Sequence, residues 1–319
     1  MHRCIAFILH NAASLNTPRE SGMRHQLSLH YLDTVARIGS IRKAADQHAI
    51  TSSALNRRII AMEDDLGVPI FDRVANGVRL NTAGELLIQH ARAQLADMER
   101  VKSQIHDLQG VRRGHISIVA SQALMPYIIP LQIKAYRSEH PQITFSVRVC
   151  TRFTALTELQ SYSADLAVVF EPELAPEFES VFAVPQQLHA QFNRDHSLAG
   201  GDGLRLRECL QWPLALPTKN NGIRHLLEQS ASPLSSKLNV AIESDNAYLL
   251  QRVVETSELI SFALTAGVQD NDELASLRHR SISSTDVKPG MLHIGRLKGR
   301  HLSVAAAKFL DQITEFFDT

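Results

Sequence analysis

The sequence predicts a multidomain chain of mixed α+β and α/β class, with an N-terminal winged helix-turn-helix, one long linker helix and a two-lobed α/β domain. Three observations carry this prediction. Two short amphipathic helices follow one another within residues 40–67. Apolar residues then recur at a coiled-coil period over residues 87–108. From Gly114 onward, strand-like apolar runs alternate with helix-like ones.

Length and composition agree with several domains. The 319 residues, of which 44% are hydrophobic, are enough to build more than one core. Cys4, Cys150 and Cys209 lie far apart in no metal-binding or redox spacing, which is typical of a reducing compartment. No apolar run approaches the roughly 18 residues that a membrane helix needs. We therefore expect a cytoplasmic protein that uses no membrane, metal or cofactor.

Residues 1–22 do not fit the pattern of the rest of the chain. Their apolar stretch, from Ile5 to Leu9, is shorter than the roughly 7 to 15 residues of a secretory signal. We interpret the segment as a disordered or mis-started extension that ends before Met23. Its deletion is expected to leave the function of the folded domains intact.

Residues 40–67 carry the pattern of a helix-turn-helix. Ser40 is expected to cap a first helix that ends at Gln47, and the small pair Ala44-Ala45 lets a second helix cross it closely. Thr51 is expected to cap that second helix. The apolar stripe of the second helix, which predicts a small core, consists of Leu55, Ile59, Met62 and Leu66.

Polar side chains are expected opposite that stripe. Ser53, Asn56 and Arg57 fall on the far side of the second helix, within its first two turns. Short donors, an amide and a guanidinium suit base edges and phosphates. The alternative is an ordinary solvated helix, because an apolar stripe with polar residues opposite describes most surface helices.

The next segment predicts a wing. Ile70 to Leu80 reads as two short strands around Asn76-Gly77, a strong signal for a two-residue hairpin turn. Arg73 and Arg79 lie on this hairpin, where cations could meet backbone phosphates. Alternatively, they are solvated charges at strand ends.

This order of residues resembles the LysR-type transcriptional regulators. The matching landmarks are Ser40, Ala44-Ala45, residues 51–57, Met62-Glu63, Leu66-Gly67, residues 70–73 and residues 81–84. The resemblance in motifs is strong from Leu27 to Glu85. From there to the C-terminus only the order of helices and strands resembles the family. Ser52 stands where the family usually has Gln, Asn56 where it has Ser, and His48 where it has Leu. The first two lie on the candidate reading face, whereas His48 is expected to affect packing more than recognition.

The resemblance implies that residues 23–81 bind double-stranded DNA. The residues expected to contact DNA are Arg42, Thr51, Ser52, Ser53, Asn56, Arg57, Arg58, Arg73 and Arg79.

Residues 82–110 are expected to form the linker helix. Thr82 and Glu85 form a capping-box pattern, and Gly110 is a fitting stop. The apolar positions between them are Leu87, Ala91, Leu95, Met98, Val101, Ile105 and Leu108. Their period of about 3.5 residues favours pairing with a second copy. The alternative is packing against the protein's own C-terminal domain.

The remainder predicts two α/β lobes, which resemble the family's effector domain and thereby periplasmic binding proteins. We expect a parallel βαβαβ arrangement in the first lobe. Lobe 1 is assigned to residues 114–183 and 269–319, and lobe 2 to residues 184–268.

Ligands in open parallel sheets bind beyond the carboxyl ends of the strands. Ser121 and Gln122 follow the first strand at a predicted helix N-terminus, which favours an anion. Arg152 could bind a carboxylate beside an apolar wall from Phe153. The full expected effector set is Ser121, Gln122, Arg152, Phe153, Phe170, Thr218, Asn246 and Thr265. The alternative is that Ser121 is only a helix cap and Arg152 only a surface ion pair.

The expected function is therefore transcriptional regulation in response to a small-molecule effector. We expect this effector to be a small organic anion that binds between the lobes. The expected partners are a pseudo-palindromic operator, a second copy in a homodimer that pairs into a homotetramer, and RNA polymerase. A solute-binding module and an α/β enzyme are the alternatives. The sequence lacks a Gly-x-Ser-x-Gly elbow, a His-Glu-x-x-His motif and a phosphate loop, so we expect no enzyme.

Overall fold

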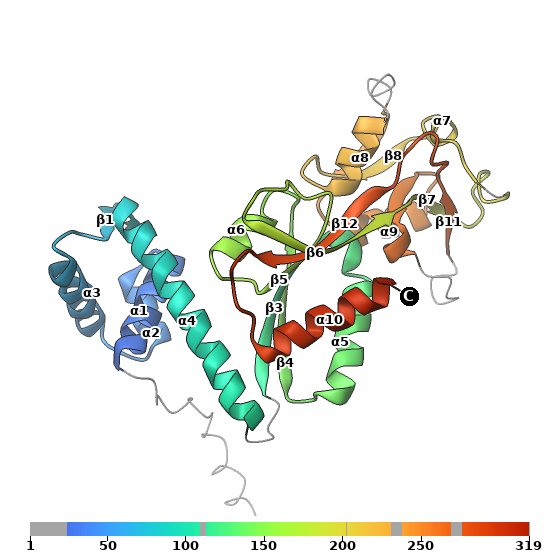
Figure 1. Ribbon diagram of the computed structural model, residues 1–319. Coiled ribbons are helices and arrows are strands. Elements are labelled where there is room, and N and C mark those ends of the chain that lie inside the picture. The colour runs from blue at the N-terminus through green and yellow to red at the C-terminus, as the bar shows by residue number, and fades with distance from the viewer. Residues whose placement is uncertain (1–23, 109–112, 202, 231–237, 269–275, 319) are drawn as a thin grey trace, which may run out of the picture. The chain divides into compact units, whose positions relative to one another are not determined.

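Three helices and a hairpin form the N-terminal part of the chain, and two α/β lobes form the C-terminal part (Figure 1). The computed structural model describes residues 24–108, 113–201, 203–230, 238–268 and 276–318. The chain divides into two compact units after Leu95, within the long helix α4. The predicted extension over residues 1–22 and the predicted helix stop at Gly110 lie outside the described residues.

The helices of the first unit begin where the sequence predicts. The Ser40 hydroxyl caps α2 by accepting a hydrogen bond from the backbone N–H of Lys43 at 3.4 Å. Thr51 caps α3 in the same way, through the N–H of Ala54 at 3.2 Å. Both predicted caps are confirmed. The elements of the unit are α1 (Arg24–Ile38), α2 (Ile41–Gln47), α3 (Ser52–Leu66), β1 (Phe71–Val74), β2 (Gly77–Leu80) and α4 (Thr82–Leu108).

A small apolar core joins these helices. Leu55 and Ile59 of α3 are buried in it, and Met62 packs against it. The prediction that Leu66 joins this core is wrong, because its side chain is 49% exposed. Leu66 is the last residue of α3, and Gly67 turns the chain in the left-handed conformation directly after it, with φ +72°.

The wing is a two-stranded hairpin whose turn lies one residue earlier than predicted. Val74 pairs with Gly77, so the turn residues are Ala75 and Asn76 rather than Asn76 and Gly77. Gly77 takes φ +145°, and a Cβ there would lie 2.0 Å from the carbonyl oxygen of Gly39. The N–H of the residue after Gly77 donates to that carbonyl at 2.9 Å. The approach of β2 to the end of α1 therefore sets the position of the turn.

Helix α4 is capped by Asn81 rather than by Thr82. The Asn81 side-chain oxygen accepts a hydrogen bond from the N–H of Gly84 at 2.9 Å, so the predicted capping box is misplaced by one residue. The Asn81 amide also donates to the carbonyl of Pro69 at 2.9 Å. This second bond ties the start of α4 to the segment that enters the wing.

The apolar stripe of α4 is covered over only part of its length. Ala91 is buried in the core of the first unit, and Leu87 and Leu95 pack against that core. Ile105, further along the stripe, is 49% exposed, and Leu86, which lies next to the stripe, is 68% exposed. Exposed aliphatic side chains on a long helix are typical of a surface that pairs with another chain.

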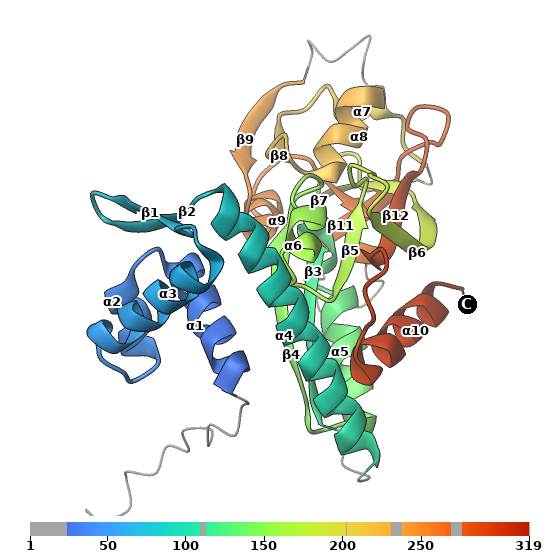
Figure 2. The ribbon, with the colours of Figure 1, turned by 60° about the vertical axis from the view of Figure 1, so that its left-hand side comes forward.

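Lobe 1 is a five-stranded sheet in the order β4-β3-β5-β12-β6. The first three strands are parallel, as predicted, and β12 is antiparallel to both of its neighbours. Helices α5 and α10 lie side by side on one face (Figure 2), where the Tyr136 hydroxyl donates to the carbonyl of Ala305 at 2.9 Å. Helix α6 packs on the other face. The elements are β3 (Gly114–Ser121), η1 (Gln122–Leu124), α5 (Ile128–Glu139), β4 (Ile143–Cys150), α6 (Ala155–Gln160), β5 (Leu166–Phe170), β6 (Phe178–Gln186), β12 (Gly290–Leu297) and α10 (Val304–Asp318).

Lobe 2 contains the antiparallel sheet β10-β7-β11 and the parallel pair β8-β9. A parallel bridge between Leu214 and Ile260 places β8 beside the start of β10. The elements are β7 (Leu188–Asn193), α7 (Leu206–Cys209), β8 (Leu214–Pro217), α8 (Gly222–Ser230), β9 (Val240–Ser244), α9 (Ala247–Glu255), β10 (Ser261–Leu264), η3 (Thr265–Gly267) and β11 (Leu277–Ser281).

Two predicted lobe boundaries are wrong. Strand β11 pairs with β7, so its residues belong to lobe 2 and not to the assigned 269–319 segment of lobe 1. Strand β6 pairs with β12 as far as Gln186, so residues 184–186 belong to lobe 1. A short strand carries no sequence signal for the sheet that it joins, because its pairing is decided by tertiary contacts.

The segment between β3 and the end of α5 is not one continuous helix. The 3-10 turn η1 comes first, and α5 begins only at Ile128. Pro126 lies in the break and cannot donate the backbone hydrogen bond that a continuous helix needs.

Candidate functional site

The N-terminal half of α3 presents a polar face to solvent. Thr51, Ser52, Ser53 and Arg57 are exposed, and Asn56 is half-buried. The hydroxyls of Thr51 and Ser53 lie 3.1 Å apart. Because the apolar stripe of α3 points into the core, this face is free to meet a partner.

Exposed cations lie on other elements of the same unit. Arg42 on α2, Arg73 on β1 and Arg79 on β2 are exposed, and none of them forms an ion pair with an acidic residue that the structure describes. Arg58 differs, because its guanidinium lies over the ring of Tyr31, 4.8 Å from the centroid. Arg58 is therefore partly committed to packing on α1.

The segment that enters the wing is held to α3 by a half-buried carboxylate. Glu63 Oε1 accepts hydrogen bonds from the N–H groups of Ile70, at 2.8 Å, and Phe71, at 3.3 Å. An ion pair of 2.6 Å between Asp33 and Arg92 ties α1 to α4. The polar face of α3 and the wing therefore form parts of one rigid unit.

His48 has a packing role. Its ring meets the ring of Tyr31 edge-on, with centroids 4.8 Å apart, and its Nε2 lies 2.8 Å from the Thr34 hydroxyl. These contacts agree with the expectation that His48 affects packing more than recognition.

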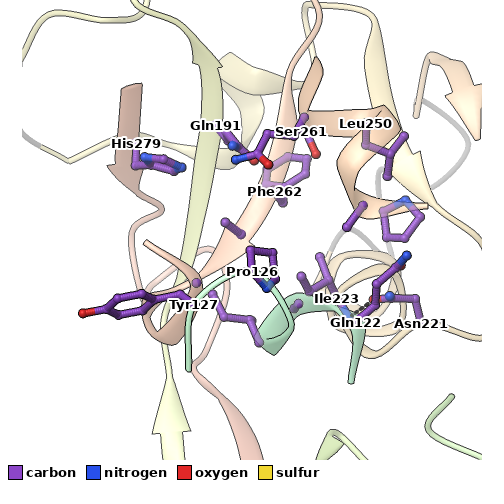
Figure 3. A pocket seen from close by; sticks show the side chains of 17 residues that line it. Gln122, Pro126, Tyr127, Gln191, Asn221, Ile223, Leu250, Ser261, Phe262 and His279 are labelled. Carbon is purple, nitrogen blue, oxygen red and sulfur yellow. Dashed lines mark hydrogen bonds between the residues drawn. The ribbon is translucent and has the colours of Figure 1, made fainter. Parts of the chain in front are cut away.

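A cavity of about 130 Å³ lies between the two lobes (Figure 3). It opens at the carboxyl ends of β3, β8 and β10, as the rule for open α/β sheets predicts. Its lining is Gln122, Ala123, Pro126, Tyr127, Gln191, Pro217, Asn221, Ile223, Ala247, Leu250, Gln251, Ser261, Phe262, Ala263, Leu264, Gly267 and His279.

The polar groups of the cavity are uncharged amides, a hydroxyl and an imidazole. Gln191 is in register with Ser261 on one side and with His279 on the other, so the three form a row across the lobe 2 sheet. Gln122 and Asn221 lie together on the opposite side, and the Tyr127 hydroxyl points away from the other labelled side chains (Figure 3). The lining residues include no Lys, Arg, Asp or Glu.

Two contacts join the lobes near this cavity. The Gln122 side-chain amide donates to the carbonyl of Asp245. The backbone N–H of Arg152 donates to the carbonyl of Asn220 at 3.4 Å. Separation of the lobes would break both bonds.

Of the eight residues expected to bind an effector, only Gln122 lines the cavity. The Ser121 hydroxyl is buried and accepts a hydrogen bond from the N–H of Phe170 at 2.9 Å, and Phe170 is itself buried. Arg152 donates through Nε to the carbonyl of Glu171 at 2.9 Å, and its guanidinium lies over the ring of Phe153.

The other three residues of that set also form hydrogen bonds within the protein and do not line the cavity. Asn246 caps α9 by accepting from the N–H of Leu249 at 3.1 Å. The Thr265 hydroxyl donates to the carbonyl of Gln187 at 3.3 Å, and Thr218 accepts a backbone bond from Asn221 at 3.0 Å.

The comparisons with known proteins cover both parts of the chain. Residues 27–85 match the family described as bacterial regulatory helix-turn-helix protein, lysR family. Residues 109–318 match the family described as LysR substrate binding domain. This chain belongs to the LysR family of transcriptional regulators. It is therefore a DNA-binding regulator with a domain for a small-molecule effector.

Individual relatives are distant. The chain is 25% identical over 291 residues to the uncharacterized HTH-type transcriptional regulator YybE of Bacillus subtilis, covering 91% of this chain and 98% of YybE. Full-length OxyR from Pseudomonas aeruginosa is similar in fold, with a TM-score of 0.67 at 16% identity, over 92% of this chain and 94% of OxyR. CbnR in complex with its target DNA has a TM-score of 0.63 at 18% identity, over 91% of this chain and 99% of CbnR.

Sequence reasoning missed Gln191, Ser261 and His279 in this LysR-family domain. All three lie inside strands, whereas the rule for open α/β sheets points to residues that follow strands. Gln191 alternates with buried Ala190 and Phe192, and it is itself 7% exposed. A polar amide between the apolar residues Ala190 and Phe192 is the signal that identifies it.

The two described thiols do not suit redox chemistry. Burial raises the pKa of Cys150 and of Cys209 to about 12 in each case. Cys150 ends β4 in lobe 1, and Cys209 ends α7 in lobe 2. Since the thiolate is the reactive form, both side chains are expected to be inert packing groups.

None of the helices that the structure describes is both long and apolar enough to cross a membrane. No group of three or more His, Cys, Asp or Glu residues in the described segments could hold a metal ion.

Proposed function

We propose that this LysR-family regulator binds a pseudo-palindromic operator as a homodimer, with α3 in the major groove and the wing on the phosphate backbone. The observation that carries this proposal is the exposed polar face of α3, together with the exposed cations Arg73 and Arg79 on the wing of the same unit. Base edges are read by short donors and amides, and phosphates are met by cations. Pairing through α4 would present two such faces to successive turns of the major groove, and pairing of dimers would give the expected tetramer.

The proposed effector binds in the cavity between the lobes and is small. The cavity of about 130 Å³ is below the roughly 300 to 1,000 Å³ of sites for drug-sized ligands. The row of Gln191, Ser261 and His279 would hydrogen-bond one side of the effector, and Gln122 and Asn221 the other. Phe262 and Leu250 supply apolar walls.

The lining lacks the cation on which the expectation of an organic anion rested. Burying an ionised carboxylate without a charged partner is costly, whereas amides and hydroxyls satisfy one another at little cost. We therefore propose an effector with hydroxyl, carbonyl or amide groups rather than a full carboxylate. Arg152 then acts as a contact between the lobes rather than as an effector ligand.

Effector binding would favour the arrangement of the lobes that closes around it. The consequence for transcription would follow from altered operator bending or altered contact with RNA polymerase. The free-energy coupling between effector binding and DNA binding can be no larger than the difference in effector affinity between the two arrangements of the lobes.

Catalysis in the cavity has no support. Ser261 and His279 lie on β10 and β11, which are both neighbours of β7. One intervening strand separates them by on the order of 10 Å, too far for a nucleophile and its base.

Gel shifts with DNA from upstream of the coding region test the proposal, in a salt series and with a library of small metabolites. We expect specific binding that weakens steeply with salt. Matched pairs of carboxylic acids and their neutral amides, compared by thermal shift, test the effector class. Absence of any sequence-specific complex would overturn the DNA proposal, and stabilisation by the acids alone would overturn the neutral effector.

A further inference from the structure

The reading face of α3 contains one exposed aliphatic side chain. Ile60 is 41% exposed, although it is a large branched hydrophobe in the middle of the helix. It is not among the residues that form or pack against the core of the first unit. Its neighbour Ile59 points into that core and is 3% exposed.

Ile60 lies on the same side of α3 as the polar residues that face solvent. It follows Ser53 by two helical turns and Asn56 by one. The far end of the face is marked by Asp64, an exposed acidic residue one turn beyond Ile60. Since phosphates repel a carboxylate, the surface that can approach DNA extends from Ser53 to Ile60.

We propose that Ile60 contacts the C5-methyl group of a thymine in the major groove and thereby determines specificity at that base pair. This inference rests on the proposed docking of α3 in the major groove. The only apolar group on a base edge in that groove is the thymine methyl, so an aliphatic side chain there can distinguish thymine from the other bases. A solvated Ile60 without a partner would instead be an isolated surface hydrophobe.

The geometry places this base pair away from those met by the polar residues. The rise from Ser53 to Ile60 is on the order of 10 Å along the helix. Because a recognition helix lies at an angle to the DNA axis, that length spans at most about three base-pair steps. A thymine preference is therefore expected within about three steps of the position read by Ser53, in each half-site.

The test compares thymine with deoxyuridine, which lacks only the C5-methyl group. The operator is first selected from random DNA by the parent protein, and each thymine is then replaced by deoxyuridine in both half-sites. At one position the parent is expected to lose about fourfold in affinity per half-site, the value of burying one methyl group. The Ile60→Ala variant is expected to bind the two operators equally, and Ile60→Val to retain the dependence.

Leu66→Ala is the matched control. Leu66 is an aliphatic residue of the same helix with similar exposure, 49%, but at 100° per residue it points away from the side of α3 that carries Ile60. This variant is expected to keep the full thymine dependence. Thermal unfolding followed by circular dichroism verifies that each variant folds.

Two results would overturn the inference. Either the parent shows no dependence on any thymine methyl, or the dependence survives unchanged in Ile60→Ala. Both differ from a failure of the proposed function, in which the parent selects no operator at all.

Discussion

The side-chain amide of Gln122 donates a hydrogen bond to the main-chain carbonyl of Asp245, across the gap between the two lobes. Gln122 begins the 3-10 turn after β3, and Asp245 directly follows β9. The same Gln122 side chain lines the cavity. One amide therefore takes part both in the contact between the lobes and in the proposed effector site.

Replacement of Gln122 by Glu is expected to weaken effector binding by roughly tenfold, because a carboxylate cannot donate to the Asp245 carbonyl. Isothermal titration calorimetry with the first effector found by thermal shift measures this loss. Gln211→Glu is the control, since Gln211 is exposed on lobe 2 and outside the cavity. An effector affinity equal to that of the parent in Gln122→Glu would show that the contact has no part in binding.

Gly77→Ala is expected to destabilise the first unit by about 2 kcal/mol or more. The new Cβ would lie 2.0 Å from the Gly39 carbonyl oxygen, so β2 must move away from the end of α1. Operator binding should fall together with stability, because the wing loses its fixed position. Urea unfolding and gel shifts measure the two effects.

Gly67→Ala is the control that measures the cost of the backbone conformation without the cost of a steric clash. Gly67 also has a positive φ, +72°, but no atom lies within 4 Å of a Cβ built there. Its replacement is expected to cost only about 1 kcal/mol, the strain of the left-handed conformation alone. Equal losses in the two variants would mean that contact with Gly39 does not position the wing.

Local signals in the sequence predict most of the first unit. The caps at Ser40 and Thr51 and the wing were predicted because each depends on a few neighbouring residues. The shift of the hairpin turn was not predicted, since it depends on Gly39, which is far from Gly77 in sequence. Tertiary contact overrode the preference of Asn-Gly for the turn itself.

The sequence predicts where the cavity between the lobes lies but not which residues line it. The rule for strand ends points to this place, and of the residues that it selects Gln122 lines the cavity. Gln191 and His279 were missed because β7 and β11 pair across about 90 residues of sequence, which no local pattern reveals. Arg152 was misplaced because its partners, the carbonyls of Glu171 and Asn220, could not be known from the sequence.

Asn56→Ala and Arg79→Ala are expected to affect DNA binding in different ways. Asn56 lies on the helix that would meet base edges. Its loss should therefore reduce the discrimination between bases by about 1 to 3 kcal/mol at one base pair. Arg79 lies on the wing, so its loss should weaken all sequences alike and reduce the salt slope by about 1 per protomer. Random-site selection and a salt titration distinguish the two effects. Exchanged outcomes would show that the wing, and not α3, reads the bases.

The stability of the second unit is expected to fall as the pH is lowered, in part through His196. This side chain is 7% exposed, it stacks on Phe192 at 5.2 Å, and its Nδ1 accepts a hydrogen bond from the N–H of Leu198 at 3.1 Å. Burial lowers the pKa of His196 below its usual value, so the folded protein binds a proton less readily than the unfolded chain. His225 and His293 have lowered pKa values for the same first cause, desolvation.

The sign of the dependence follows from this difference in proton binding. Between the unfolded pKa of about 6.5 and the lower folded value, the unfolded state takes up more protons, so stability is present at neutral pH and is lost as the pH falls. The Tm is expected to decrease between about pH 7.5 and about pH 5.5. His196→Asn preserves an acceptor for Leu198 but cannot titrate in this range, so it should flatten part of the decrease. An equal slope in the parent and His196→Asn would exclude His196 as a cause.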